Sequence, residues 1–145
     1  VIPNFIYWSM QEKSLPLTGT GDETRDFTYV LDLVQGLIKA AFYDDAIGQA
    51  FNLASGKETK IKDMIAMVNQ STGNSTEITR FPPRKWDTKK RLLASIELAG
   101  KLIDYKPIVS FEDGLNENFK WFSNNWDKVQ LSADFPAGMS SAVRK

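Results

Sequence analysis

The feature that most constrains the fold is an alternation of helix patterns with short apolar runs in the middle of the chain. Residues 31–42 and 61–72 carry apolar side chains at helical spacing, and Gly73 marks the end of the second helix. Between them, the apolar run at residues 50–54 predicts a buried strand. Because alternating helices and strands pack in layers, we expect a small mixed α/β domain. The apolar positions of the first helix, which predict its buried face, are Leu33, Val34, Leu37, Ile38, Ala41 and Phe42.

The first thirty residues predict another helix and two strands. Residues 1–10 are apolar and aromatic with Pro3 near the start, which favours a short helix with proline in its first turn. A strand is the alternative for this segment. Residues 15–18 and 24–30 have strand-like composition and flank a polar turn at residues 19–23, so together they predict a hairpin.

A proline pair ends the strand that is predicted at residues 77–81. Pro82 and Pro83 cannot continue a regular strand, and the polar connection that follows runs to Ala94. Ser95 is placed to cap a short helix that ends near residue 102.

The last predicted helix begins at a capping-box sequence in which Ser110 precedes Asp113 by three residues. An apolar stripe at spacings of three and four residues predicts one face in the core. We assign residues 1–128 to one domain and residues 129–145, which are small and polar, to a loose tail. The members of the stripe are Phe111, Leu115, Phe119, Phe122 and Trp126.

Composition excludes several classes of function. The 18 basic and 18 acidic residues cancel, so no global charge favours nucleic acid or an anionic membrane as a partner. The absence of histidine and cysteine excludes Ser-His-Asp and thiol catalysis and His-ligated zinc, and we predict no metal site. No apolar run is long enough to span a bilayer, and a cytoplasmic location is the expectation.

A glycine-containing turn followed by an arginine is the first candidate binding site. Residues 16–18 and Arg25 flank the turn that contains Gly19 and Gly21. Backbone groups there can meet a planar base, and a guanidinium pairs bidentately with phosphate oxygens. From spacing alone a plain hairpin with a surface arginine is favoured, because a single Gly-x-Gly is weak evidence for a phosphate site.

The polar connection after the proline pair carries the second candidate. Arg84 and Arg91 suit a diphosphate, and Asp87 can accept a hydrogen bond from a sugar hydroxyl. A solvated basic linker is the alternative. Trp86 fits a lid over a ligand and a packing anchor equally well.

A set of motifs in a fixed order resembles the extended short-chain dehydrogenase/reductase family. The motifs are RDFTYV-x-D-L, FNLASG, PPRKWD, KKR and YKP-x-x-SFEDGL, across residues 3–126. The resemblance is closest to epimerases of the UDP-glucose 4-epimerase kind, and UDP-glucuronate decarboxylases and dTDP-glucose dehydratases share most of these segments. The resemblance implies that the chain is the domain that binds the nucleotide sugar. The substrate-binding residues that it implies are Pro16, Leu17 and Thr18 beside the base, and Arg25, Arg84, Asp87 and Arg91 near the diphosphate and the sugar.

Three further residues match family positions and are given structural roles. Asn52 and Gly56 fall in the family's NLxSG segment, where we expect backbone roles, and Asp32 is placed to cap a helix. Three residues depart from the family pattern. Ser14 occupies a position near the uridine strand where glycine is frequent in the family. Ala94 stands where the KKR segment often continues to aspartate, and Asp104 replaces a glycine, although aspartate tolerates the left-handed conformation better than most residues.

The family's cofactor-binding and catalytic motifs do not occur in the chain, which has no GxxGxxG turn and no Tyr-x-x-x-Lys pair. NAD is therefore expected in the full-length enzyme, bound by a missing N-terminal Rossmann domain, and we predict no cofactor-binding or catalytic residue here. The chain opens at Val1 inside an apolar pattern, as expected at a fragment boundary.

These observations predict the nucleotide-sugar-binding C-terminal part of an NAD-dependent nucleotide-sugar epimerase or dehydratase, which is inactive by itself. The expected partners are a UDP-sugar or dTDP-sugar and the missing Rossmann domain. The alternative is a stand-alone, non-catalytic module that binds a nucleotide sugar or another protein.

Overall fold

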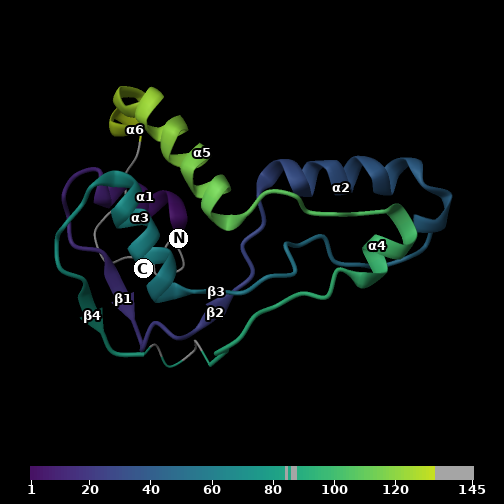
Figure 1. Ribbon diagram of the computed structural model, residues 1–145, viewed down its shortest axis with the longest axis horizontal. Coiled ribbons are helices and arrows are strands. Elements are labelled where there is room, and N and C mark those ends of the chain that lie inside the picture. The colour runs from purple at the N-terminus through teal and green to yellow at the C-terminus, as the bar shows by residue number, and fades with distance from the viewer. Residues whose placement is uncertain (84, 86–87, 133–145) are drawn as a thin grey trace.

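Buried side chains form two separate clusters in the computed structural model, which describes residues 1–83, 85 and 88–132. The first cluster lies among the helices α1 (Ile2–Ser9), α3 (Ile61–Thr72) and α5 (Phe111–Asn124). The second lies between α2 (Val30–Phe42) and α4 (Glu97–Ile103), at the opposite end of the molecule from the short strands β1 (Pro16–Thr18) and β4 (Thr79–Phe81) (Figure 1). The fold is the small mixed α/β structure that the sequence predicts.

The first helix is present, and its strand alternative is wrong. Proline stands in the first turn of α1, where its missing N–H costs no hydrogen bond. Phe5, Ile6 and Trp8 point into the first cluster. The Ser9 hydroxyl donates to Asn69 Oδ1 at 3.0 Å, so a polar contact also joins α1 to α3.

Helix α3 follows its predicted pattern closely. Met64, Ile65 and Val68 are fully buried, as expected for residues that share one face of a helix. The helix ends at Gly73, which has a φ of 73° in the left-handed region. Glycine adopts this conformation without steric strain, so the predicted stop is confirmed.

Helix α5 begins with the predicted capping box. Ser110 Oγ accepts a hydrogen bond from the Asp113 backbone N–H at 3.0 Å and donates to the Asp113 carboxylate at 2.6 Å. The predicted stripe faces the first cluster, with Leu115 and Phe122 buried and the other three members packed against it. Helix α6 (Trp126–Ser132) carries helical structure past residue 128, and residues 133–145 of the predicted tail lie outside the described residues.

The predicted hairpin is wrong, because the two strands on either side of the turn pair with different partners. Strand β1 lies parallel to β4, with Leu17 opposite Arg80. Strand β2 (Thr24–Arg25) lies antiparallel to β3 (Thr59–Lys60). The predicted second strand is also too long, because β2 ends at Arg25 and helix α2 already begins at Val30.

Helix α2 has the predicted length but buries the face opposite to the predicted one. Its buried residues are Asp32 and Gly36. A Cβ at Gly36 would lie 2.8 Å from carbons of Leu53 and Tyr105, so only glycine allows this close approach. Six of its large apolar side chains are exposed, from Val34 at 40% to Phe42 at 82%. The exposed residues are Val30, Leu31, Val34, Leu37, Ile38 and Phe42.

Asp32 has a structural role, but it does not cap helix α2 as predicted. No side-chain hydrogen bond caps α2; the Asp32 carboxylate accepts hydrogen bonds from the backbone N–H groups of Ile108 and Val109 at 3.2 and 3.0 Å. Asp32 therefore joins α2 to the segment that precedes α5.

The strand predicted at residues 50–54 is not formed. Within the described part of the chain, no strand pairs with this segment. Phe51 and Leu53 are half-buried against the second cluster, and Asn52 between them is exposed. This alternation is typical of a strand, but the backbone has no neighbouring strand to form a ladder with.

Helix α4 begins one residue later than predicted and ends as expected. Its N-cap is Ile96, and Ser95 accepts only a long 3.5 Å hydrogen bond from the Glu97 N–H. Asp104 ends the helix with a φ of 49°, in the left-handed conformation that its position requires.

Candidate functional site

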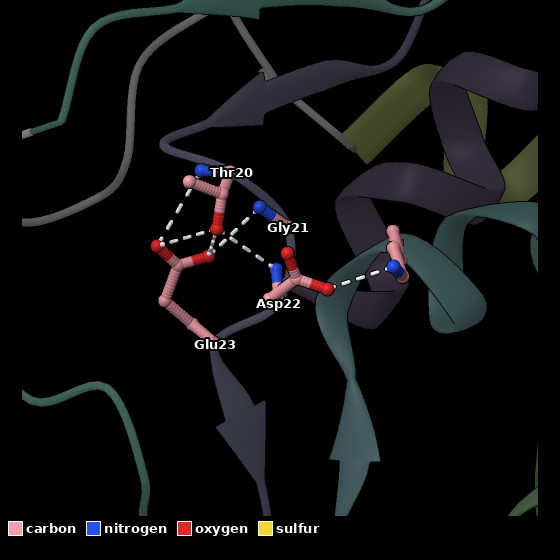
Figure 2. Close-up of polar contacts among 5 residues, drawn as sticks. Thr20, Gly21, Asp22 and Glu23 are labelled. Carbon is pink, nitrogen blue, oxygen red and sulfur yellow. Dashed lines mark hydrogen bonds and ion pairs between the residues drawn. The ribbon is translucent and has the colours of Figure 1, made fainter.

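A tightly bonded turn connects β1 to β2 (Figure 2). The Glu23 carboxylate accepts hydrogen bonds from the backbone N–H groups of Gly21 at 2.8 Å and Thr20 at 3.4 Å. The hydrogen bond from its own backbone N–H, followed by those from Gly21 and Thr20, lowers the pKa of Glu23. Asp22 forms an ion pair with Lys62 at 2.7 Å, which joins the turn to α3. The orientation of Arg25 relative to β1 is thus set by a turn with many internal contacts.

This turn does not suit the diphosphate of NAD. Peptide N–H groups near a glycine pair can bind phosphate, but here Glu23 already occupies the N–H groups of Thr20 and Gly21. A Cβ on Gly19 would lie 2.8 Å from the same carboxylate. A second anion would meet both steric overlap and like-charge repulsion.

The segment at residues 89–92 lies directly beside β2. The Thr24 N–H donates to Lys90 O at 2.9 Å, and the Leu92 N–H donates to Thr24 O at 3.2 Å. Arg25 Nη1 donates to Lys89 O at 3.1 Å and to Thr24 O at 2.8 Å. Arg25 is therefore partly engaged by the backbone of the second candidate segment.

The loop after the proline pair is held at both ends by the segment around the turn. At its start, the Gly19 N–H donates to Phe81 O at 3.0 Å. At its end, Lys89 accepts from Arg25. Residues 82–88 thus connect a point beside β1 with a point beside β2, which brings the two candidate segments together. Arg84 and Asp87 belong to this loop but lie outside the described residues.

Glu58 contacts both β2 and residues 89–92. Its Oε1 accepts hydrogen bonds from Thr24 Oγ1 at 2.6 Å and from Arg91 Nε at 2.8 Å. The bond from Arg91, followed by that from Thr24, lowers the pKa of Glu58, and the same ion pair raises the pKa of Arg91. The Arg91 side chain is 68% exposed, so its guanidinium has one edge on Glu58 and remains open to solvent.

A second carboxylate, that of Asp26, joins three segments next to Arg25. Oδ1 accepts from the Ser55 N–H at 3.0 Å and from the Ser55 hydroxyl at 2.5 Å. Oδ2 accepts from the N–H groups of Gly56 at 3.0 Å and Ala94 at 3.4 Å. β2 ends at Arg25, and the side chain of the next residue joins two other segments to this point.

The predicted base-binding residues differ in what they expose. Leu17 is 1% exposed and belongs to the first cluster, so it can offer a ligand only its backbone. Pro16 and Thr18 are half-buried at the ends of β1.

Sequence reasoning missed Asp26 and Glu58. Asp26 stands inside the RDF motif, where the neighbouring Arg25 drew attention as a phosphate ligand. The segments that meet at Asp26 are far apart in sequence, so no local pattern indicates their contact. Asn52 and Gly56 have structural contacts. Asn52 Nδ2 donates to Ser95 O at 3.3 Å. The Gly56 N–H donates to Asp26 Oδ2, and the backbone of Gly56 has a φ of 68°.

The arrangement favours anion binding over acid–base chemistry. Arg25 follows Thr24 in β2 and Arg91 pairs with Thr24, and both arginines already bond to groups that restrict their positions. Among residues 1–83, 85 and 88–132, no group of acidic side chains is arranged to hold a metal ion. In the same ranges, no helix is long and apolar enough to cross a membrane.

Comparison with solved structures gives close matches over most of the chain. The epimerase Mth375 of Methanothermobacter thermautotrophicus matches with a TM-score of 0.90 and 47% identity over 92% of this chain and 40% of that one. Bordetella bronchiseptica WbmF, solved in complex with NAD+ and UDP, matches with a TM-score of 0.78 and 39% identity over 90% of this chain and 39% of that one.

Curated sequences also match this chain over most of its length. UDP-glucuronic acid decarboxylase 1 of Xenopus tropicalis is 30% identical over 145 residues, which is all of this chain and 34% of the relative. UDP-glucuronate 4-epimerase of Thermodesulfobacterium geofontis is 30% identical over 128 residues, or 87% of this chain and 38% of the relative. The chain thus spans between a third and two fifths of the length of these relatives.

The family model for GDP-mannose 4,6 dehydratase matches residues 1–118. This match covers most of the chain, and the curated relatives above are named as a UDP-glucuronic acid decarboxylase and a UDP-glucuronate 4-epimerase. The chain therefore belongs to the GDP-mannose 4,6 dehydratase family, within the extended short-chain dehydrogenases/reductases.

Proposed function

We propose that the chain is the nucleotide-sugar-binding C-terminal part of a cytoplasmic, NAD-dependent nucleotide-sugar epimerase or dehydratase, closest in reaction to UDP-sugar 4-epimerases. The observation that carries the proposal is the pairing of the two candidate segments at Gly19–Phe81 and Arg25–Lys89. Solved neighbours include the Bacillus cereus UDP-glucuronic acid 4-epimerase in complex with a UDP-sugar analogue and NAD, 28% identical with a TM-score of 0.78.

In this proposal the chain binds and orients the substrate. The edge formed by Pro16, Leu17 and Thr18 receives the base, and Arg25 and Arg84 neutralise the diphosphate. Asp87, on the same loop as Arg84, adds a contact to the sugar, and Arg91 lies near the ligand. A diphosphate needs more than one cation, and guanidinium groups can bond adjacent phosphoryl oxygens.

The nicotinamide chemistry belongs to the rest of the parent enzyme. NAD, bound by a Rossmann domain outside this chain, supplies hydride transfer at a sugar carbon. The occupied Gly19–Glu23 turn supports this division, because it leaves no room for a second diphosphate.

The chain by itself is expected to show no turnover in spectrophotometric assays with UDP-glucose, UDP-glucuronate or dTDP-glucose and added NAD. Product that persists after repurification would contradict the proposal.

Binding is best measured in a chimera in which this chain replaces the matching segment of the Methanothermobacter epimerase, because an isolated pocket is open to water. Arg25→Ala should remove a charge-assisted contact worth about 1.5–3 kcal/mol and raise the Kd for a UDP-sugar roughly ten- to a hundredfold in isothermal titration calorimetry. Arg84→Ala should have an effect of the same size.

A matched control is Lys101→Ala, which removes an exposed positive charge on α4 in the other cluster. It should leave the Kd unchanged. Equal weakening by Lys101→Ala and Arg25→Ala would mean that net charge alone governs the affinity. An unchanged Kd in the Arg25→Ala, Arg84→Ala double variant would exclude the diphosphate site.

A further inference from the structure

Glu58 bonds to two side chains that come from different neighbouring segments. It directly precedes β3, which lies beside β2 and places Lys60 opposite Thr24 (Figure 1). On the other edge of β2, Arg91 pairs with Thr24. Glu58 Oε1 accepts from Thr24 Oγ1 at 2.6 Å and from Arg91 Nε at 2.8 Å. One carboxylate oxygen therefore connects β3, β2 and the segment at residues 89–92.

The backbone of Arg91 is fixed by β2, but the direction of its side chain depends on Glu58. The Thr24 N–H donates to Lys90 O and the Leu92 N–H donates to Thr24 O, so the backbone is held on both sides of Arg91. The Arg91 side chain is 68% exposed, and that of Glu58 is 24% exposed. Within the described part of the chain, the bond to Glu58 uses Nε, and no hydrogen bond engages the two Nη groups. A long exposed side chain otherwise samples many rotamers, so this bond sets the orientation of the guanidinium plane.

The ion pair makes the Arg91 guanidinium better suited to sugar hydroxyls than to a diphosphate. Glu58 compensates the positive charge at 2.8 Å, which weakens the attraction of Arg91 for a second anion. The Nη groups remain hydrogen-bond donors in a fixed fork, and a hydroxyl oxygen accepts such bonds. Arg91 also stands four residues after Asp87, the residue proposed to contact the sugar.

We infer that Glu58 is a positioning residue of the nucleotide-sugar site, which presents the Nη groups of Arg91 to the hydroxyls of the sugar. Glu58 itself does not touch the ligand and acts through Arg91. The inference rests on the proposed function, because it assigns a role within the same site. Fixing Arg91 in advance lowers the conformational entropy that its side chain loses on binding. The effect should therefore appear with a nucleotide sugar and be absent with the nucleoside diphosphate alone.

Isothermal titration calorimetry on the chimera, with UDP-glucose and UDP as separate probes, tests this role. Glu58→Ala should raise the Kd for UDP-glucose about three- to tenfold and change the Kd for UDP by less than about twofold. Glu58→Gln keeps an oxygen for Arg91 Nε and should hold the Kd for UDP-glucose within about twofold of wild type. The matched control is Glu117→Ala, which removes the carboxylate of an ion pair with Lys120 on α5 and should change neither Kd.

A double-mutant cycle shows whether Glu58 acts through Arg91. Arg91→Ala alone should weaken UDP-glucose binding, and adding Glu58→Ala to it should have no further effect. Losses that multiply in the double variant would overturn the inference. Equal weakening of UDP and UDP-glucose by Glu58→Ala would also overturn it, because a general distortion of β2 and β3 affects both ligands.

The two proposals can fail separately in these titrations. If UDP itself does not bind to the chimera, the proposed function is wrong, and the role of Glu58 falls with it. If UDP and UDP-glucose bind and Glu58→Ala changes neither Kd, the proposed function stands and the positioning role is wrong.

The isolated chain gives a readout that needs no ligand. In NMR spectra, the Arg91 Nε–H should exchange with water at least about tenfold faster in Glu58→Ala than in wild type, and Glu58→Gln should restore most of the protection. If Glu58→Ala does not fold, Glu58→Asp replaces it, because the shorter side chain also withdraws the carboxylate from Arg91. Unchanged exchange of the Arg91 Nε–H in the folded variant would overturn the inference.

Discussion

Replacing Asp26 with asparagine should destabilise the chain more than its half-buried position suggests. The aspartate has two oxygens, and each accepts two hydrogen bonds. Asparagine keeps one oxygen and replaces the other with an NH2 group. If the oxygen stays on Ser55, the NH2 group faces the N–H groups of Gly56 and Ala94, and these donors lose their acceptor.

The size of the effect follows from the hydrogen bonds that are lost. Hydrogen bonds to a charged group contribute about 1.5–3 kcal/mol each, and partial exposure of this site lowers that figure. For two lost bonds we expect Asp26→Asn to reduce the free energy of unfolding by about 2–3 kcal/mol. Asp26→Ala loses all four and should cost about 3–5 kcal/mol, a large fraction of a typical domain's stability.

Urea unfolding monitored by tryptophan fluorescence measures these changes, and amide exchange at Ser55 and Gly56 locates them. The matched control is Asp45→Asn, at an exposed aspartate in the short helix η1 (Asp44–Ala46), which should stay within about 0.5 kcal/mol of wild type. The reasoning is refuted if Asp26→Asn unfolds at the wild-type urea concentration with unchanged exchange at both amides.

Three further outcomes follow from the packing and the charges. Gly36→Ala should lower the free energy of unfolding in urea by about 1–3 kcal/mol, because the added methyl group would lie 2.8 Å from two side-chain carbons. Gly100→Ala, where the atom closest to the added methyl group is 3.7 Å away, should raise that free energy by about 0.5–1 kcal/mol. Phe122→Ala, at a 5% exposed position, should lower the free energy of unfolding by about 3–5 kcal/mol, and Phe119→Ala should lower it less because its ring is half-buried. Equal losses of stability in thermal unfolding would contradict the assigned burial. The pKa of Glu58 is lowered in the folded state, so its charged form stabilises the fold above the ordinary glutamate pKa. This stabilisation is lost as the pH falls through the lowered pKa, and Glu58→Gln should remove this pH dependence from unfolding curves.

Local signals in the sequence predicted the helices well. The capping box at Ser110, the left-handed stop at Gly73 and the apolar spacing of α3 each depend on residues within one or two turns. Such interactions act between near neighbours, so the sequence pattern contains them directly.

The strand pairing and the orientation of α2 could not be predicted in the same way. The predicted hairpin is wrong because β1 pairs with Thr79–Phe81, about sixty residues away, and β2 pairs with Thr59–Lys60. The predicted buried face of α2 is wrong, because the chain packs the glycine side of the helix instead. For the candidate site, the sequence identified the arginines, and their carboxylate neighbours Asp26 and Glu58 emerge only from tertiary contacts.

The two separate hydrophobic clusters have a consequence for how the molecule opens. Among residues 1–83, 85 and 88–132, the second cluster has three buried members, Ala99, Ile103 and Tyr105, against eleven in the first. A unit with so little buried apolar surface can unfold locally at a lower free energy than the whole chain, as an independent cooperative unit. Amides in α4 should then exchange through a partial opening that leaves α1, α3 and α5 intact. Unfolding followed by exchange would show two steps, and proteases would first cut the connections around α4.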